Sequence, residues 1–158
     1  MNQSIKRLSD ANELELKETL ALVQHVFFEF EAPDYSNEGI EQFKQFISFE
    51  QITKQLVNQE LIIWTHYTST AQITGMVALK LPSHISLLFV DKSFHKKGIA
   101  RQLMQTASIY SQKRYNTNKL TLNSSPYAFD FYKHIGFVPT DTQQEIDGII
   151  FTPMKKMV

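Results

Sequence analysis

The first third of the chain carries apolar residues at the spacing of a helix. Those between Ser9 and Pro33 stand three or four positions apart, which places them on one helix face, and they are Leu16, Leu20, Val23, Phe27 and Phe30. Ser9 or Asp10 offers a side-chain oxygen that can cap the start of this helix. The apolar spacing also predicts two shorter helices, around residues 40–47 and 52–56.

After residue 60 the pattern changes to short runs of β-branched and aromatic residues, which are typical of strands. These runs are 61–67, 72–81, 84–90, 119–123 and 148–154, with another at 5–8. A helix is predicted over 98–114, so the strands on either side of it form a crossover and should be parallel. Hairpins would join the remaining strands as antiparallel neighbours. With a short helix from Pro126 to about Gly136, the pattern predicts a mixed α/β sandwich whose sheet is mostly antiparallel.

Length and composition narrow the class of protein. The 158 residues fit a single domain over 1–158, because typical domains run about 100–200 residues. Hydrophobic residues make up 42% and charged residues 20%, which is ordinary for a globular protein. The absence of cysteine excludes disulfides, thiolate metal sites and a cysteine nucleophile. The N-terminus lacks the apolar core of a signal peptide, and no apolar run approaches the ~18–20 residues of a membrane span, so we expect a cytoplasmic protein without a membrane partner.

Charge is unevenly distributed although the formal net charge is zero. Residues 1–60 hold 11 acidic and 5 basic side chains, whereas residues 61–158 hold 5 acidic and 11 basic ones. Such asymmetry indicates partners of opposite charge, and ordinary variation of a solvated surface explains it equally well. Nucleic-acid-binding proteins more often carry a clear positive charge, so no nucleic acid partner is expected.

The loop between the strand 84–90 and the helix 98–114 has the features of an anion site. It enters the helix through Gly98, and backbone N–H groups at a helix start attract anions with the help of the helix dipole. Glycine lacks a Cβ atom, so the backbone can approach an anion closely. Lys96, Lys97 and Arg101 add positive charge. A pyrophosphate would suit this loop, and a solvated helix start without a ligand is the alternative. The glycine patterns of P-loop and Rossmann proteins are absent, so those two nucleotide-binding motifs are excluded.

This loop resembles the signature of the GNAT superfamily of N-acetyltransferases. The signature is Gln or Arg, two variable residues, Gly, one variable residue, and Gly or Ala. The chain has His95-Lys96-Lys97-Gly98-Ile99-Ala100, so His95 departs from the usual Gln or Arg. Because the backbone contacts do not depend on that side chain, coenzyme binding is expected to survive the change.

A second stretch matches the other strong motif of the same family. After a strand, the family has a helix with Ala, two residues, an apolar residue and Tyr, followed by Gly-Phe. The chain supplies Ala128, Phe131-Tyr132 and Gly136-Phe137 in that order, with Ser125 where an asparagine is usual and Asn123 nearby. The resemblance extends to the outer elements and implies an acyl-CoA N-acyltransferase fold with helices on both faces of the sheet.

The resemblance implies a coenzyme site. In the family, the loop amides hold the coenzyme A pyrophosphate and the end of the preceding strand pairs its backbone with the pantetheine arm. The expected coenzyme-binding residues are Leu88, Phe89, Val90, His95, Lys96, Lys97, Gly98, Ile99, Ala100, Arg101, Asn123 and Ser125.

Tyr132 and His84 are the candidate catalytic residues. A phenol beside the sulfur can protonate the departing thiolate, which is the role of the family's tyrosine at this position, and a core aromatic is the alternative for Tyr132. The attacking amine must be neutral, and a histidine has a suitable pKa of ~6.5 to act as base. His84 stands where histone-acetylating relatives have a glutamate base, and an exposed histidine beside a turn is the alternative.

The acceptor site is the least defined part of the prediction. In the family the N-terminal helices line it, and here Phe28, Glu29, Glu31 and Tyr35 mix carboxylates with rings that would suit a cation. A solvated loop whose phenylalanines face the core is the alternative.

Two functions follow from these residues. The first is direct transfer of an acetyl group from acetyl-CoA, as co-substrate, to a primary amine of a small molecule or peptide, without a covalent enzyme intermediate. The second is a non-catalytic module that senses acyl-CoA. No histidine has metal-ligand spacing, so no metal is expected, and a homodimer is compatible with the resemblance.

Overall fold

The computed structural model describes residues 4–158; residues 1–3, the beginning of the N-terminal stretch considered above, lie outside it. In chain order the elements are β1 (Ile5–Arg7), α1 (Glu13–Phe30), η1 (Ala32–Asp34), α2 (Asn37–Phe46), α3 (Phe49–Val57), β2 (Leu61–Tyr67), β3 (Ile73–Lys80), β4 (His84–Val90), η2 (Lys92–Phe94), α4 (Ile99–Tyr115), β5 (Lys119–Ser124), α5 (Phe129–His134), β6 (Val138–Pro139), β7 (Gln144–Ile146) and β8 (Ile149–Met157). Within the described residues, no helix is both long and apolar enough to cross a bilayer.

Most predicted elements are confirmed, but some boundaries were wrong. Helix α1 is capped by Asn12, whose side-chain oxygen accepts the Glu15 N–H at 3.0 Å, and not by Ser9 or Asp10. Pro126 is not at a first helical position, because α5 begins only at Phe129. The Ser125 side chain accepts the Ala128 N–H at 3.2 Å and closes a turn ahead of that helix. The short strands β6 and β7 were not predicted.

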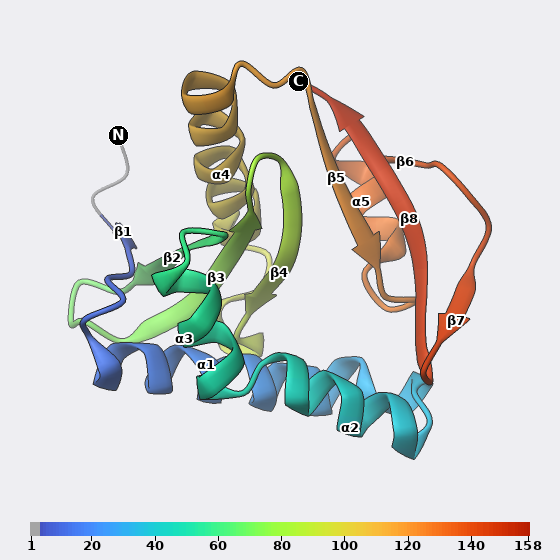
Figure 1. Cartoon of the computed structure of the whole chain (residues 1–158), viewed down its shortest axis with the longest axis horizontal. Coiled ribbons are helices and arrows are strands. Elements are labelled where there is room, and N and C mark those ends of the chain that lie inside the picture. Colours follow the sequence, from blue (N-terminus) through green and yellow to red (C-terminus); the bar gives the residue numbers. More distant parts are fainter. Residues whose placement is uncertain (1–3) are drawn as a thin grey trace.

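The sheet has eight strands in the order β1-β2-β3-β4-β5-β8-β6, with β7 paired to β8. Among the strands of residues 4–158, only β4 and β5 pair in parallel, which confirms the predicted crossover. Their ladder covers only two residue pairs, His84 with Thr121 and Ile85 with Leu122, and the strands then diverge (Figure 1). Ser86 forms a bulge at the point of divergence, since Ala78 pairs with Leu87 but Leu79 already pairs with Ile85. A bulge bends its strand, so β4 leaves β5 and opens the sheet where the loop before α4 lies.

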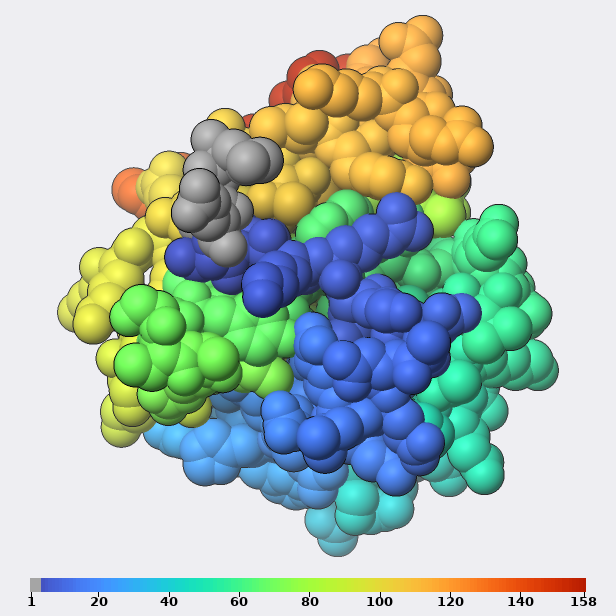
Figure 2. All heavy atoms as spheres, turned by 90° about the vertical axis from the view of Figure 1, so that its left-hand side faces the viewer, coloured from blue at the N-terminus to red at the C-terminus, as the bar shows by residue number. Residues whose placement is uncertain are grey.

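Alternating residues of the central strands build two hydrophobic cores, one on each face. Ile63, Met76 and Ala78 pack with residues of α1 and α3, whereas Val77 and Leu79 pack with residues of α4 and α5. This alternation is the two-residue period of a β-strand. The result is a mixed α/β architecture with helices on both faces, as predicted. Figure 2 shows the edge, where β1 and the start of α1 (blue) lie between the end of α4 (orange) and α3 (teal).

Candidate active site

The loop before α4 exposes a series of backbone N–H groups. Lys96 and Gly98 both have positive φ angles, of 62° and 77°, and this turns the chain sharply before the helix. Gly98 is the N-cap and provides no side-chain cap, and the first helical bond runs from the Gln102 N–H to the Gly98 carbonyl at 3.1 Å. Among the hydrogen bonds found in residues 4–158, none is donated by the backbone N–H groups of residues 96–101. Unpaired amides at a helix start form an anion site.

Glycine is needed at position 98 for its backbone conformation. A Cβ atom added there would meet no other atom within 4 Å, so the protein itself leaves this space open. At a φ of 77°, however, most residues with a side chain are strained by roughly 1–2 kcal/mol. The open space lies beside the unpaired amides, where an anion could approach the backbone directly.

The side chains of the loop divide into two groups. His95 Nε2 donates to the Val90 carbonyl at 2.7 Å, so the imidazole braces the loop against the end of β4. The Lys97 ammonium lies over the Phe94 ring, 5.6 Å from its centre. Lys96 and Arg101 line the adjacent cavity. Those two supply formal positive charge at the amides, and Lys97 contributes its backbone N–H. The His95 N–H is bonded to the Lys92 carbonyl at 3.2 Å.

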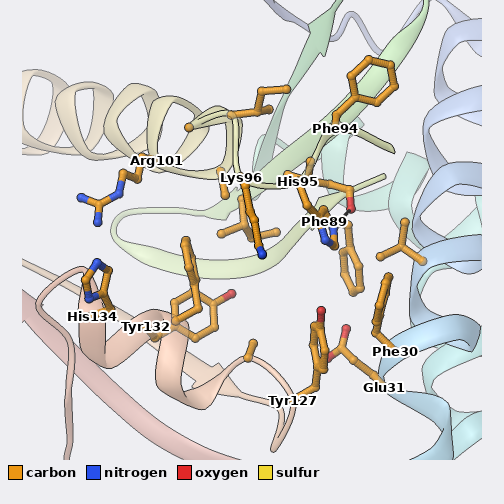
Figure 3. Close-up of a pocket in the computed structure, with 18 residues that line it drawn as sticks. Phe30, Glu31, Phe89, Phe94, His95, Lys96, Arg101, Tyr127, Tyr132 and His134 are labelled. Carbon is orange, nitrogen blue, oxygen red and sulfur yellow. Dashed lines mark hydrogen bonds between the residues drawn. The ribbon is translucent and has the colours of Figure 1, made fainter. Parts of the chain in front are cut away.

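A first cavity of about 660 Å³ lies between this loop, the end of β4, α5 and the end of α1. Figure 3 shows Lys96 and Arg101 on the loop side, Tyr132 and His134 from α5, and Phe30, Glu31 and Tyr127 grouped together. The Phe30 ring stacks on Tyr127 with centres 4.8 Å apart and also contacts His95 at 5.3 Å. The cavity therefore joins the cationic loop to an aromatic wall.

A second cavity of about 460 Å³ extends across the opening between β4 and β5. It is lined by α2, α3, β4, β5 and the β7–β8 hairpin. The residues that line both cavities are Glu31, Leu88, Phe89, Ala128 and Tyr132. Glu31 is the shared carboxylate and Tyr132 the shared hydroxyl, so these two polar side chains stand where the cavities meet.

Tyr132 is packed into α5 with only 7% of its surface exposed. Its ring makes edge contacts with Phe131 and Phe137, at 5.5 and 5.7 Å between centres. Burial, and then the negative charge of Glu31, raise the pKa of the Tyr132 hydroxyl. The phenol is therefore protonated at neutral pH, and it points toward the side of the first cavity where Glu31 lies (Figure 3).

Glu31 is held at the end of α1, where its backbone N–H bonds the Phe27 carbonyl at 2.9 Å before the chain turns into η1. Burial raises the pKa of its carboxyl from 4.5 to about 6. A side-chain hydrogen bond with Ser125 acts in the opposite direction, and the nearby charge of Asp34 raises the pKa further. A carboxylate with this pKa is mostly ionised at pH 7 and can accept a proton there.

His84, Asn123 and Ser125 line the second cavity and not the first. His84 Nδ1 lies 2.8 Å from the Thr121 hydroxyl, and burial, followed by the charge of Lys80, lowers the pKa of its imidazole. It stands four residues along β4 from Leu88, or about 13 Å from the meeting point of the cavities. The expected coenzyme contacts of Asn123 and Ser125 are therefore not supported by where these residues lie.

The predicted acceptor residues separate into two pairs. Glu31 and Tyr35 line the second cavity, and the Tyr35 ring packs on Phe27 at 5.3 Å. Phe28 is 41% exposed and lines neither cavity. Glu29 also lies outside both and pairs with Lys92 at 3.5 Å, because helical periodicity turns it away from Glu31.

The predicted site residues did not include Tyr127 and His134, which line the first cavity, or Lys80, which lines the second. Tyr127 and His134 lie inside the stretch that carried the second motif. Lys80 pairs with His84 across the β3–β4 hairpin. The short break at residues 82–83, between the predicted strands 72–81 and 84–90, was the signal that could have placed Lys80 opposite His84.

Comparisons with known proteins establish the family and the fold. Residues 31–158 match the family model described as an acetyltransferase (GNAT) domain. A GCN5-related N-acetyltransferase from Rhodopseudomonas palustris is similar in structure, with a TM-score of 0.77, 19% identity, and 100% of this chain and 97% of that chain covered. The PaiA N-acetyltransferase of Thermoplasma acidophilum, solved with coenzyme A, has a TM-score of 0.77, 20% identity and coverage of 99% and 100%.

A spermidine N-acetyltransferase chimera derived from Vibrio cholerae SpeG is also similar, with a TM-score of 0.64, 18% identity, and 98% of this chain and 96% of that chain covered. At these identities the solved structures establish the shared fold. Among curated proteins, no sequence matches.

Proposed function

The chain belongs to the acetyltransferase (GNAT) family, which makes it an acetyl-CoA-dependent acyltransferase, and we propose that it transfers the acetyl group directly to a primary amine held in the second cavity. The observation that carries this proposal is the meeting of two cavities at Tyr132 and Glu31, one of them bordered by the unpaired amides of 96–101. One cavity would take the donor and the other the acceptor.

The first cavity suits coenzyme A. The amides of residues 96–101 would hold the pyrophosphate, with Lys96 and Arg101 adding charge. From Ser86 onward β4 has no partner on its β5 side, so its backbone near Leu88 and Val90 is available to the amide groups of the pantetheine arm. The coenzyme complex of PaiA, which shares this fold, supports the assignment.

Tyr132 would act as the general acid. As the amine nitrogen bonds to the carbonyl carbon, the carbon–sulfur bond breaks and the sulfur needs a proton. Burial raises the pKa of the phenol, but the same burial raises the pKa of a thiol leaving group, so it does not by itself oppose the transfer. Phe131 and Phe137 hold the ring in place.

Glu31 would act as the general base in place of His84. Because a lysine-like amine has a pKa of ~10.4, only about a few molecules per ten thousand are neutral at pH 7. Glu31 lies at the meeting point, whereas His84 lies about 13 Å away along β4. Glu31 would take one proton from the ammonium group to give the neutral amine. The nitrogen loses a second proton as the amide forms, and this proton restores the Tyr132 hydroxyl after Tyr132 has protonated the sulfur, so the reaction balances with one proton released overall.

The two transfers are coupled through charge. The negative charge of Glu31 is one cause of the raised pKa of Tyr132. When Glu31 takes the proton of the amine, that charge disappears and the phenol becomes a stronger acid. Deprotonation of the nucleophile therefore prepares the acid for the leaving group.

An acceptor screen with thiol detection tests the proposal. Purified protein and acetyl-CoA are incubated with a panel of primary amines, and free coenzyme A thiol is measured. We expect thiol release with at least one amine class, and its loss in Tyr132→Phe. Binding of acetyl-CoA without thiol release for any amine would refute the proposal and favour the acyl-CoA-sensing module.

A further inference from the structure

The charged side chains of the second cavity stand at opposite ends. Glu31 lies beside Tyr132, where the cavities meet. Lys80 and His84 lie at the other end, paired across the β3–β4 hairpin. The parallel register sets His84 level with Thr121, at the closed end of the opening between β4 and β5. The cavity is therefore acidic where the reaction would occur and basic at its far end.

Lys80 faces the cavity and has no acidic partner. Strand alternation puts it on the same face of β3 as Met76 and Ala78, the face that α1 and α3 cover. Among residues 4–158, no carboxylate lies within salt-bridge distance of its ammonium group. The neighbouring His84 has a pKa lowered by burial and by Lys80 itself, so Lys80 carries the positive charge at this end.

The other carboxylate of the cavity stands far from Lys80. Asp147 lies in the β7–β8 turn, and Lys155 of β8 is level with Thr121 and hence with His84. The strand β8 begins at Ile149, after that turn, and the six residue steps from Ile149 to Lys155 span about 20 Å. Asp147 therefore cannot neutralise Lys80.

Apolar rings form the wall between the two ends. Phe43 of α2 stacks on Phe27 at 3.9 Å and contacts Phe89 at 6.0 Å. Phe46 and Phe151 line the same cavity. Such a wall favours an acceptor with an apolar or aromatic body and disfavours an extended polycation.

We propose that the acceptor is a primary amine whose apolar body ends in an anionic group, with the amine at Glu31 and the anion at Lys80. This inference rests on the proposed transfer reaction. The four residue steps along β4 from His84 to Leu88 span about 13 Å, and Lys80 is a long side chain that lines the same cavity, so the amine and the anion would stand on the order of 10 Å apart. Carboxylate and phosphate share the required charge.

Three matched amines test the charge at the far end. The compounds are para-(aminoethyl)benzoate, para-(aminoethyl)benzamide and para-(aminoethyl)benzylamine, which share one body and end in an anion, a neutral amide and a cation. Their affinities are measured by calorimetry in the presence of coenzyme A, and thiol release from acetyl-CoA is measured separately. Because binding is read without turnover, failure of this inference and failure of the transfer reaction are distinguishable.

We expect the benzoate to bind about fivefold more tightly than the benzamide, as for a partly exposed ion pair. Lys80→Gln should remove this preference, and Lys80→Glu should move it to the benzylamine. Lys113→Gln makes the same charge change on α4, outside both cavities, and should leave the preference intact.

Two results would overturn the inference. One is equal or weaker binding of the benzoate than of the benzamide. The other is a preference for the benzoate that survives in Lys80→Glu. Preferential benzoate binding without thiol release would uphold the anion site and count against the transfer reaction alone.

Discussion

Replacement of Glu31 by glutamine should raise the stability of the protein at pH 7 while lowering its catalytic activity. Burial raises the pKa of the Glu31 carboxyl from 4.5 to about 6, so the folded protein binds the proton more tightly than the unfolded chain does. The stability associated with this proton is complete below pH 4.5 and is lost as pH rises through 6. Above that window, burial of the ionised Glu31 carboxylate lowers the free energy of unfolding by about 2 kcal/mol, at 1.36 kcal/mol per pKa unit. A neutral glutamine of nearly the same shape avoids it.

We therefore expect Glu31→Gln to be more stable than the parent at pH 7, by up to about 2 kcal/mol less any weakening of the Ser125 hydrogen bond. Denaturant unfolding at pH 4 and pH 7 measures this, and the gain should appear only at pH 7. The same variant should lose about a hundredfold or more in kcat/KM, which is the usual contribution of a general base.

The pH profile provides the sharper assay. In the parent, kcat/KM should fall below an apparent pKa of about 6, as the base becomes protonated, and Glu31→Gln should lack this acidic limb. Glu29→Gln is the matched control, because Glu29 is also at the end of α1 but pairs with Lys92 outside both cavities. A Glu31→Gln variant with parental rate and an unchanged acidic limb would refute the assignment of the base.

Three further substitutions test other parts of the site. Tyr132→Phe should lower kcat by about a hundredfold or more with unchanged acetyl-CoA affinity in a titration, while Tyr110→Phe, outside both cavities, should have no effect; equal rates in Tyr132→Phe and parent would rule out the acid. Gly98→Glu should abolish acetyl-CoA binding without lowering the free energy of unfolding by more than the roughly 1–2 kcal/mol of φ strain. An unchanged affinity for acetyl-CoA would mean that the phosphates bind elsewhere. Gly39→Ala drives a Cβ into the backbone of Gly148, so the β7–β8 hairpin should shift and the acceptor KM rise at constant coenzyme affinity; an unchanged KM would show that this wall does not contact the acceptor.

Local sequence features predicted most of the elements and the loop that exposes backbone N–H groups before α4. The limits of β4, His84–Val90, agree with the prediction at both ends, because an apolar run between a Pro-Ser turn and a polar loop leaves little choice. The amides before α4 were also predictable, since Gly98 and the following helix lie within a few residues of each other. The charge and ring pattern of α1, by contrast, predicted acceptor contacts for Phe28 and Glu29, and these two residues line neither cavity.

The tertiary structure alone decided where the two cavities meet. A single bulge at Ser86 lies where the β4–β5 ladder ends after two residue pairs. No local sequence pattern predicted that β4 and β5 would diverge there. The second cavity extends across the opening that this divergence leaves, and it is lined by His84, Asn123 and Ser125, although the last two were expected beside the coenzyme.

What the sequence determined by itself is set by short-range forces: periodic burial, turn chemistry and the free N–H groups of a helix start. What it left open depends on strand register and on contacts between residues far apart in the chain. Glu31 gains its raised pKa and its partner Ser125 only when the end of α1 packs against the turn before α5. Side-chain direction at such contacts is chosen by the whole core, and for that reason only the fold showed that Glu31 and Tyr132 line the same part of both cavities.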